Sequence, residues 1–463
     1  MLVAQSNSTF HTFFRFGHAA TDRQAAYLTS AEIAHAADSD NIERACDDAV
    51  RSGGVTYAQL IDKFEEIGKM VEDGFDVASA EPKITNKEMS IERTNMPLAP
   101  VPRLLRNAEV TDPLTGTVSG ARKDVMRKNM TKVIDETLAT VPNAVYIGED
   151  VQHGGYYLVT DGLDKKYPRR VCDFPPDETT LVGAGMGYAQ AGLLPIVEIP
   201  YAKYLDCGAD MFFEACVGTW LSGGTRGDGM VVRLQGFDRG TFGGNFHTHN
   251  MLHMPPGIDV VCYSNGEDYV RGFRNAVKQA QAGRLVMLVD CTDLLNKRHL
   301  HLEDKDRGWE RGYPEEGEMV SYDDVRVYGG GEGRGKVAVV TYGNGVVTSL
   351  LARKELAKSG ACEEADVDVI DCMLLSSIPE GLPEELAHYD KVLFADICKE
   401  GQNPLGGMLG GLQKGKEMGG ADLGEKDWRF VCAPRTYNPL GNVLTFLNVD
   451  DVVEGVKDVL KIS

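Results

Sequence analysis

The stretch from Asp173 to Tyr204 constrains the fold more than any other part of the chain. It opens with Pro175 and Pro176, which disfavour regular helix at that point, and Glu178 follows shortly after. The next run, GAGMGYAQAG, is built of small residues, which allow a helix or turn to pack closely against another surface. Residues 193–200 are short, apolar and β-branched, which is typical of a buried strand.

Glu178 has two interpretations on pattern alone. A single acid at the mouth of a tightly packed apolar element is a candidate general acid or base. A carboxylate at the start of a helix can equally cap that helix, because its negative charge suits the N-terminal end. The residue pattern by itself leans towards capping.

Strands alternate with helices on both sides of this stretch. Strands are predicted at 144–150, 193–200, 230–236, 258–264 and 284–290, and helices at 123–140, 204–222 and 266–282. This alternation predicts an α/β fold, with a parallel sheet covered by helices on both faces. A second α/β unit follows from residue 336, with strands in KVAVVTYGNG, DVDVIDC and KVLFADIC.

Five segments are expected along the chain. Residues 1–80 form a helical segment, 81–120 a linker or arm, 121–310 the first α/β domain, 311–335 a linker, and 336–463 the second α/β domain. In the helical segment, a helix start is predicted at Thr29 and Ser30, and the Gly53–Gly54 pair separates two further helices. Five prolines between residues 81 and 120 favour a linker there.

Composition narrows the class of protein. A net charge of −21 argues against a nucleic-acid partner. The ten cysteines show no CxxC or Cys/His ligand spacing, so we expect reduced thiols in an intracellular compartment and no protein-held metal. No apolar run reaches the length that spans a membrane, and the first residues lack the pattern of a signal peptide.

Residues 122–463 resemble the β subunit of the thiamine-diphosphate-dependent 2-oxoacid dehydrogenases, the E1 component. The matching pieces, in order, are AVYIGEDVQHGG, GLDKKYPRRVCDFPPDE, GAGMGYAQAG, EIPYAKY, the FHTH loop, PPGIDVVCYS and KVAVVTYGNG. No single piece is specific, but the ordered set is. The resemblance implies a transketolase-like pyrimidine-binding domain followed by a transketolase C-terminal-like α/β domain.

The N-terminus carries a second resemblance. RFGHAATDRQAAYLTSAEI and the segments after it look like the C-terminal end of an E1 α subunit, of the branched-chain type. The chain therefore resembles the tail of an α subunit joined to a β subunit. Its PLG and DICKEG segments resemble fused single-chain E1 proteins more than they resemble separate subunits. His18 matches the α loop that lines the channel to the cofactor, and its own role is open. A serine that is phosphorylated in some relatives falls on Ala19 or Ala20, so no control is expected there.

The resemblance changes the interpretation of Glu178. Thiamine diphosphate loses a proton from its thiazolium ring through its own aminopyrimidine, which must be in the imino form. That form requires a buried carboxylic group sharing a proton with the N1′ ring nitrogen. The family's glutamate matches Glu178, which the resemblance therefore makes catalytic as well as cofactor-binding.

Three other positions are implied by the same resemblance. Tyr204 matches an aromatic residue that packs on the pyrimidine ring, with core packing as the alternative. His247 matches a histidine that faces the 2-oxoacid, with a surface histidine as the alternative. Glu149, in GED, matches a cofactor-site residue near the contact between α and β halves, with a strand-end salt bridge as the alternative. His249 stands where relatives usually have a polar residue, and its role is open.

The sequence Gly227–Gly229 is similar to part of a metal-binding motif. The GDG sequence, with Asn245 or Asn250 downstream, is similar to the motif whose Asp and Asn bind the Mg²⁺ that holds the diphosphate. This copy precedes a predicted strand of the pyrimidine domain, where a turn is the simpler interpretation. The diphosphate and Mg²⁺ are therefore expected to be held mainly by a partner.

The resemblance implies oxidative decarboxylation of a 2-oxoacid, branched-chain by preference, with acyl transfer to a lipoyl carrier. The alternatives are a pyruvate or acetoin dehydrogenase E1 β subunit, or a truncated non-catalytic assembly subunit; transketolase-type enzymes fit less well. Expected partners are an E1 α-like half or fused chain and the lipoyl acyltransferase E2, in a heterotetramer or homo-oligomer. The expected compartment is the bacterial cytoplasm or the mitochondrial matrix, without membrane or nucleic-acid contact.

Overall fold

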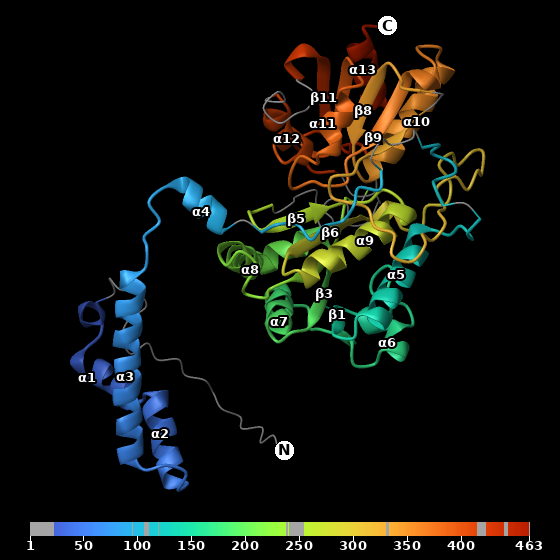
Figure 1. Cartoon of the computed structure of the whole chain (residues 1–463). Coiled ribbons are helices and arrows are strands. Elements are labelled where there is room, and N and C mark those ends of the chain that lie inside the picture. Colours follow the sequence, from blue (N-terminus) through green and yellow to red (C-terminus); the bar gives the residue numbers. More distant parts are fainter. Residues whose placement is uncertain are drawn as a thin grey trace. The chain divides into compact units, whose positions relative to one another are not determined.

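The computed structural model describes residues 23–94, 96–105, 111–118, 120–237, 239, 254–329, 333–413, 423–438 and 443–462. The chain forms two compact units, Met1–Lys87 and Glu88–Ser463 (Figure 1). Among the helices in these ranges, none combines the length and apolarity needed to cross a bilayer.

The first unit is helical. Its helices are α1 (Ser30–Asp38), α2 (Asn41–Arg51) and α3 (Tyr57–Ala80). Thr29 caps α1 in a capping box with Glu32, so the predicted helix start is confirmed. Gly53 lies between α2 and α3 with φ of +75°, a left-handed conformation that favours glycine and ends the helical path.

The second unit begins with a six-stranded sheet in the order β2-β1-β3-β4-β6-β5. Its strands are β1 (Ala144–Gly148), β2 (Val171–Asp173), β3 (Leu194–Ile199), β4 (Met230–Gly236), β5 (Ile258–Val261) and β6 (Leu285–Cys291). All neighbouring pairs are parallel. β1, β3, β4, β5 and β6 are buried along their whole length, so the predicted parallel sheet is confirmed.

Helices cover both faces of this sheet (Figure 1). They are α5 (Met126–Thr140), α6 (Leu163–Lys166), α7 (Glu178–Gln190), α8 (Ala209–Leu221) and α9 (Gly266–Gln281). The small residues of α7 allow the close approach expected from the sequence. A Cβ atom on Gly185 would lie 2.7 Å from Cγ2 of Val197 in β3, closer than real side chains approach.

The second sheet has the order β11-β10-β8-β9-β7. Its strands are β7 (Arg326–Tyr328), β8 (Val337–Thr341), β9 (Val367–Asp371), β10 (Lys391–Lys399) and β11 (Asp427–Ala433). The helices around it are α10 (Asn344–Lys358), α11 (Gly381–Leu386), α12 (Pro404–Leu412) and α13 (Val449–Leu460), and α4 (Lys87–Arg93) lies in the proline-rich arm. β7 is antiparallel to β9, which makes this sheet mixed.

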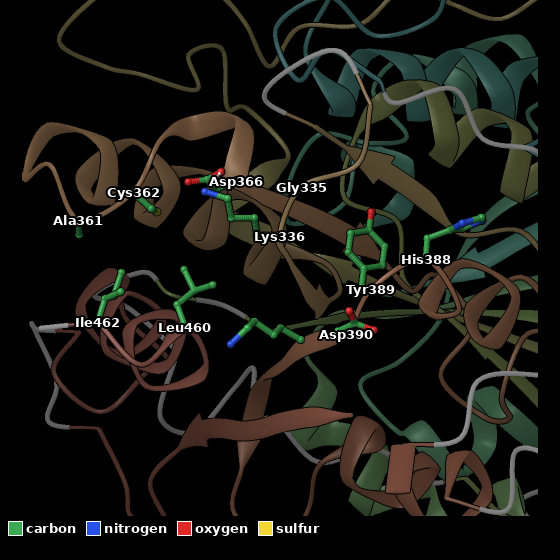
Figure 2. A pocket seen from close by; sticks show the side chains of 11 residues that line it. Gly335, Lys336, Ala361, Cys362, Asp366, His388, Tyr389, Asp390, Leu460 and Ile462 are labelled. Carbon is green, nitrogen blue, oxygen red and sulfur yellow. Dashed lines mark ion pairs between the residues drawn. The ribbon is translucent and has the colours of Figure 1, made fainter. Parts of the chain in front are cut away.

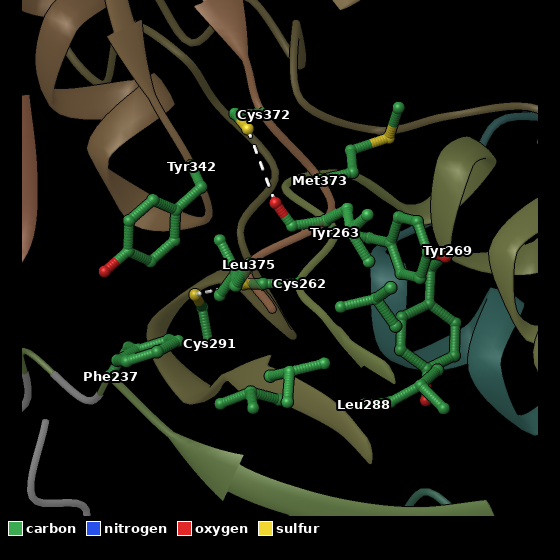
Figure 3. Packing of buried hydrophobic residues seen from close by; sticks show 14 of the residues in the cluster. Phe237, Cys262, Tyr263, Tyr269, Leu288, Cys291, Tyr342, Cys372, Met373 and Leu375 are labelled. Atoms are coloured by element: carbon green, nitrogen blue, oxygen red, sulfur yellow. Dashed lines mark hydrogen bonds between the residues drawn. The ribbon is translucent and has the colours of Figure 1, made fainter. Parts of the chain in front are cut away.

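The two sheets meet across a buried apolar cluster (Figure 3). The backbone N–H of Cys262, just after β5, donates to the carbonyl of Met373, and Leu375 donates back to Val260, at 2.9 and 2.8 Å. Tyr342 packs edge-on against Phe237, with ring centroids 5.6 Å apart. A backbone connection and a shared core therefore join the two α/β parts of this unit.

A buried arginine joins three strands of the first sheet. Arg233 of β4 pairs with Glu198 of β3, at 2.5 Å between Nη1 and Oε2, and with Asp290 of β6, at 2.6 Å between Nε and Oδ2. Tyr146 of β1 donates its hydroxyl to the same Glu198, and Gln235 donates to its other oxygen at 3.0 Å. These side chains fix the strand register on one face of the sheet.

Two glycines of α7 provide a matched test of this packing. We expect Gly185→Ala to lower the melting temperature, because the added methyl group has no room against β3. Gly187→Ala adds the same methyl group where nothing lies within 4 Å, so we expect it to leave stability unchanged or raise it by about 0.5–1 kcal/mol. Thermal unfolding of the two variants checks this; equal effects would contradict the proposed close packing.

Candidate active site

The carboxyl ends of β1 and β3 form the centre of the candidate site. In the sheet, β2 lies on one side of β1 and β3 lies on the other side. The chain therefore reverses its direction of travel across the sheet between β2 and β3. In open parallel sheets, ligands bind at such a switch point, outside the carboxyl ends of the strands. The segments that follow β1, β2 and β3 carry Glu149, Glu178 and Tyr204 respectively, so the fold brings three of the predicted site residues to one edge.

Glu178 is the first residue of α7, and its side chain is buried although it is charged in water at neutral pH. The helix is capped by its neighbour instead: Asp177 accepts a hydrogen bond from the N–H of Thr180 at 3.1 Å. The Thr179 hydroxyl donates to the carbonyl of Cys207 at 2.9 Å, and a Cβ on Gly208 would lie 2.8 Å from the carbonyl oxygen of Glu178. The structure thus gives the capping role to Asp177 and leaves the Glu178 carboxylate for another use.

Glu149 is a second buried carboxylate beside Glu178. Only 8% of its surface is exposed, and its Oε1 is buried without a hydrogen-bond partner among the described residues. Burial raises the pKa of Glu149, and the negative charge of Glu178 raises it further. Glu149 therefore holds its proton more strongly than an exposed glutamate does.

Three tyrosines form one wall next to this carboxylate pair. The Tyr156 hydroxyl donates to Oε2 of Glu149 at 3.4 Å, and burial raises the pKa of Tyr156 to about 12. The Tyr201 ring lies edge-on to both neighbours, with centroids 5.3 Å from Tyr156 and 5.5 Å from Tyr204. Burial raises the pKa of Tyr204, and the negative charges of Glu149 and Glu178 raise it further. The Tyr204 hydroxyl therefore lies within electrostatic range of both carboxylates.

Tyr204 also packs against the hydrophobic core with part of its ring. Both interpretations made from the sequence, ring contact and core packing, are therefore compatible with its position. Sequence reasoning did not single out Tyr156, Tyr201 or Asp177. The signal for Tyr201 was present in the EIPYAKY motif, where it stands three residues before Tyr204. Nothing in the sequence around Tyr156 pointed to Glu149.

The histidine loop begins at the same edge of the sheet, because β4 ends there at Gly236. His247 and His249 lie outside the described residues, as does His18. Arg239, at the start of this loop, is held by the second α/β part: its guanidinium donates to the hydroxyl of Thr348 at 2.5 Å and to Oδ1 of Asn448 at 3.0 Å.

The GDG sequence lies at the opposite edge. Asp228 precedes β4, and Gln190 at the far end of α7 donates to it at 2.6 Å. Arg226 forms an ion pair with the same carboxylate at 3.1 Å. A helix of this length separates its ends by roughly 20 Å, so Asp228 is remote from Glu178. Both carboxylate oxygens have protein partners, which agrees with a structural turn. Within the described ranges, no cluster of three or more His, Cys, Asp or Glu is arranged to hold a metal ion.

A cavity of about 500 Å³ lies elsewhere, at the amino-terminal ends of β8 and β10 (Figure 2). Lys336 and Asp366 form an ion pair on its wall at 2.9 Å, and Leu460 and Ile462 supply an apolar part. Glu149, Glu178 and Tyr204 are not among the residues that line it. Its size alone does not make it the active site, because the buried carboxylates and the switch point are at the other sheet.

Known proteins share these features. Residues 123–294 match the family model described as "Transketolase, pyrimidine binding domain". A solved structure, "Split gene transketolase, inactive beta4 tetramer", superposes with a TM-score of 0.51 at 16% sequence identity, covering 73% of this chain and 99% of the other. The chain has a transketolase-like fold. The expected fold class is confirmed, including the second α/β domain and the helical segment in front.

Two relatives extend the comparison to sequence. The "Acetoin:2,6-dichlorophenolindophenol oxidoreductase subunit beta" of Cupriavidus necator is 26% identical over 274 residues, covering 56% of this chain and 74% of the relative. The "Pyruvate dehydrogenase E1 component subunit beta" of Staphylococcus aureus strain COL is 27% identical over 297 residues, covering 60% and 81%. This chain is therefore similar in sequence to the β subunits of an acetoin oxidoreductase and of a pyruvate dehydrogenase E1 component, and neither comparison indicates a branched-chain substrate.

The raised pKa of Glu149 predicts a pH-dependent stability. The folded chain holds the proton of Glu149 more strongly than the unfolded chain does. Protonated Glu149 therefore contributes its full stability below its unfolded pKa, near 4.5. That contribution is lost as the pH rises through the higher pKa of the folded chain. Glu149→Gln should remove that loss, so its melting temperature should exceed that of the unmodified chain at pH 7 and converge with it towards pH 4.5.

The control is Glu355→Gln, which removes an exposed carboxylate of α10 that pairs with Lys358. Differential scanning calorimetry between pH 4.5 and 7.5 compares the three proteins. Melting curves for Glu149→Gln that run parallel to those of the unmodified chain across this range would contradict the assignment.

Proposed function

We propose that this chain is the β-like part of an E1 component that decarboxylates a 2-oxoacid and transfers the acyl group to a lipoyl carrier. The observation that carries the proposal is the buried pair of Glu149 and Glu178 at the switch point of a transketolase-like sheet. A desolvated acid pair beside an aromatic wall suits proton exchange with a heteroaromatic ring better than it suits packing.

The residues present fit the pyrimidine half of thiamine diphosphate. Glu178 would hold the ring nitrogen N1′, Tyr204 would pack against the ring, and Glu149, whose buried Oε1 has no partner, would bind at the contact with the other half. When bound, the cofactor supplies a carbon nucleophile for the ketone carbon of the 2-oxoacid.

Glu178 performs the proton step assigned to this chain. Its side chain is buried, so a proton shared with a ring nitrogen would be shielded from water. Glu149 supports this step, because its own tendency to keep a proton limits the charge that accumulates beside Glu178. His247 is proposed to face the 2-oxoacid, on the strength of its place in the FHTH motif.

The second half of the site is proposed to come from an E1 α-like half or fused chain. α8, which packs beside α7, exposes Phe213, Val217 and Leu221 at four-residue spacing, with 40%, 46% and 68% of each surface open. This spacing forms one apolar stripe on the helix surface. An apolar stripe next to the helix that carries Glu178 suits a permanent subunit contact, in a heterotetramer or homo-oligomer that delivers acyl groups to an E2 acyltransferase.

The substrate is proposed at the level of its class. The resemblance of the N-terminal segment to an E1 α subunit favours a branched-chain 2-oxoacid as the substrate. The similarity to the β subunits of pyruvate and acetoin enzymes favours pyruvate or acetoin. All ten cysteines are free thiols, which agrees with a reducing compartment such as the bacterial cytoplasm or mitochondrial matrix. Turnover of the reconstituted complex on pyruvate, acetoin and branched-chain 2-oxoacids decides between these substrates.

Glu178→Gln tests the catalytic assignment. In the complex reconstituted with the diphosphate-binding half, we expect turnover of the 2-oxoacid to fall at least about 10²-fold, the usual effect of removing a positioned acid or base. Far-UV circular dichroism should show an unchanged fold, because Asp177 provides the helix cap. Glu454→Gln, an exposed carboxylate on α13, serves as the control and should keep full turnover. Near-normal turnover of Glu178→Gln with cofactor bound would refute the role.

The isolated chain is predicted not to hold thiamine diphosphate. The described residues supply the pyrimidine side, but Asp228, the acid of the GDG sequence, is already paired at the far edge of the sheet. Without the partner, diphosphate would lack Mg²⁺ ligands and a helix N-terminus. Titration calorimetry with Mg²⁺ and cofactor on the purified chain checks this. Tight, Mg²⁺-dependent binding to the chain alone would show that the metal site lies within it.

A further inference from the structure

Helix α3 of the first unit carries an apolar stripe that the unit itself does not cover. Its members recur at helical spacing and share one face: Tyr57, Leu60, Ile61, Phe64, Ile67, Val71 and Phe75. Apart from Leu60, these side chains are 46–71% exposed. Ser39 is the one buried side chain among residues 23–87, so α1, α2 and α3 build no core of their own in this range.

The stripe is large enough for a stable interface. α3 has 24 residues and is therefore about 36 Å long. With roughly 150–250 Å² for an aromatic side chain, and less for Ile and Val, the six most exposed members offer on the order of 700 Å² of apolar surface. A standard specific interface buries about 800 Å² on each partner. A helix this exposed needs a partner, because packing of an apolar face supplies most helical stability in proteins.

The charges of α3 lie away from the stripe. Its carboxylates, which share the remaining part of the helix surface, are Asp62, Glu65, Glu66, Glu72, Asp73 and Asp76. At 100° per residue none of them falls within the apolar face, which is centred on Phe64 and Val71. Two copies of the stripe can therefore face each other without bringing like charges into contact, although the chain as a whole has a net charge of −21.

We propose that α3 is a self-association element, whose apolar stripe packs against the same stripe of a second copy of this chain. The seam is self-complementary: aromatic and branched aliphatic residues alternate along it, as in helix pairs that interlock side chains around a two-fold axis. This inference is independent of the proposed catalytic function, because it uses only residues of the first unit.

A photocrosslinking experiment on the full chain tests the contact directly. p-Benzoylphenylalanine replaces Phe64 on the stripe or, as the matched control, Glu65 on the charged side. Equal amounts of ¹⁵N-labelled and unlabelled chain are mixed, irradiated and analysed by mass spectrometry. We expect covalent dimers of mixed label, joined through α3 peptides, from position 64, and at least about tenfold fewer from position 65.

A pair of double variants tests the driving force. For this test p-benzoylphenylalanine replaces Tyr57, another member of the stripe, which should also crosslink to a second copy in the otherwise unmodified chain. Phe64→Glu with Val71→Glu places charge in the seam, and it should abolish the position-57 crosslink and reduce the mass seen by sedimentation velocity. Glu65→Gln with Glu72→Gln changes as many residues outside the seam and should preserve both. Circular dichroism confirms that α3 remains helical in each. Crosslinks confined to one isotope label, crosslinks to another part of the chain, or an unchanged assembly in the seam variant would each overturn the proposal.

Discussion

The ion pairs of the buried Arg233 guanidinium are the interaction on which the first sheet of the second unit depends. The guanidinium lies between Glu198 and Asp290 and so ties β3, β4 and β6 together within the sheet. A buried charge that loses its partner costs several kcal/mol, and a one-residue slip of any strand would turn these side chains to opposite faces. Glu198 also contacts the loop after β1, since a Cβ on Gly155 would lie 2.9 Å from its Oε1. The register of the sheet thereby sets where the segment carrying Glu149 can lie.

The site is arranged at a cost to stability. Glu149 and Glu178 would be better solvated on the surface, and their closeness adds repulsion that burial strengthens. Elsewhere in the same unit several buried carboxylates are paired with cations: Arg326 meets Asp268 with two nitrogens, and Arg271 meets Glu267 at 2.5 Å. Two others, Asp371 and Asp396, accept hydrogen bonds from the hydroxyl groups of Ser264 and Tyr342 instead. Among the described residues, the pair at the switch point differs from these acids in that two carboxylates lie together without an ion-pair partner, an arrangement that a functional role explains.

Apolar periodicity allowed five of the strands in the first sheet, their helices and the second α/β sheet to be predicted. Glu149, Glu178 and Tyr204 were singled out by the family resemblance, and the structure places the segments that carry them at one edge of the sheet. Four features were not predicted, and the first of them is the three-residue strand β2. β7 has three residues within a charged segment, too short for a periodic signal. The charge network of Arg233 depends on the register between strands far apart in the chain. The effect of Glu178 on the pKa of Glu149 depends on tertiary closeness, which spacing of 29 residues does not reveal.

The hydrogen bonds between the segment after β9 and the end of β5 have a mechanical consequence. The N–H of Cys262 donates to Met373 and the N–H of Leu375 donates to Val260, so two backbone hydrogen bonds cross the junction of the two sheets beside a shared core. Domains that close around a ligand usually swing on a few unbonded hinge residues. Here a swing would break backbone bonds and open the packed cluster, so the two sheets are expected to move as one rigid body. Any closure around a substrate is then left to the loops at the sheet edge and to an incoming subunit.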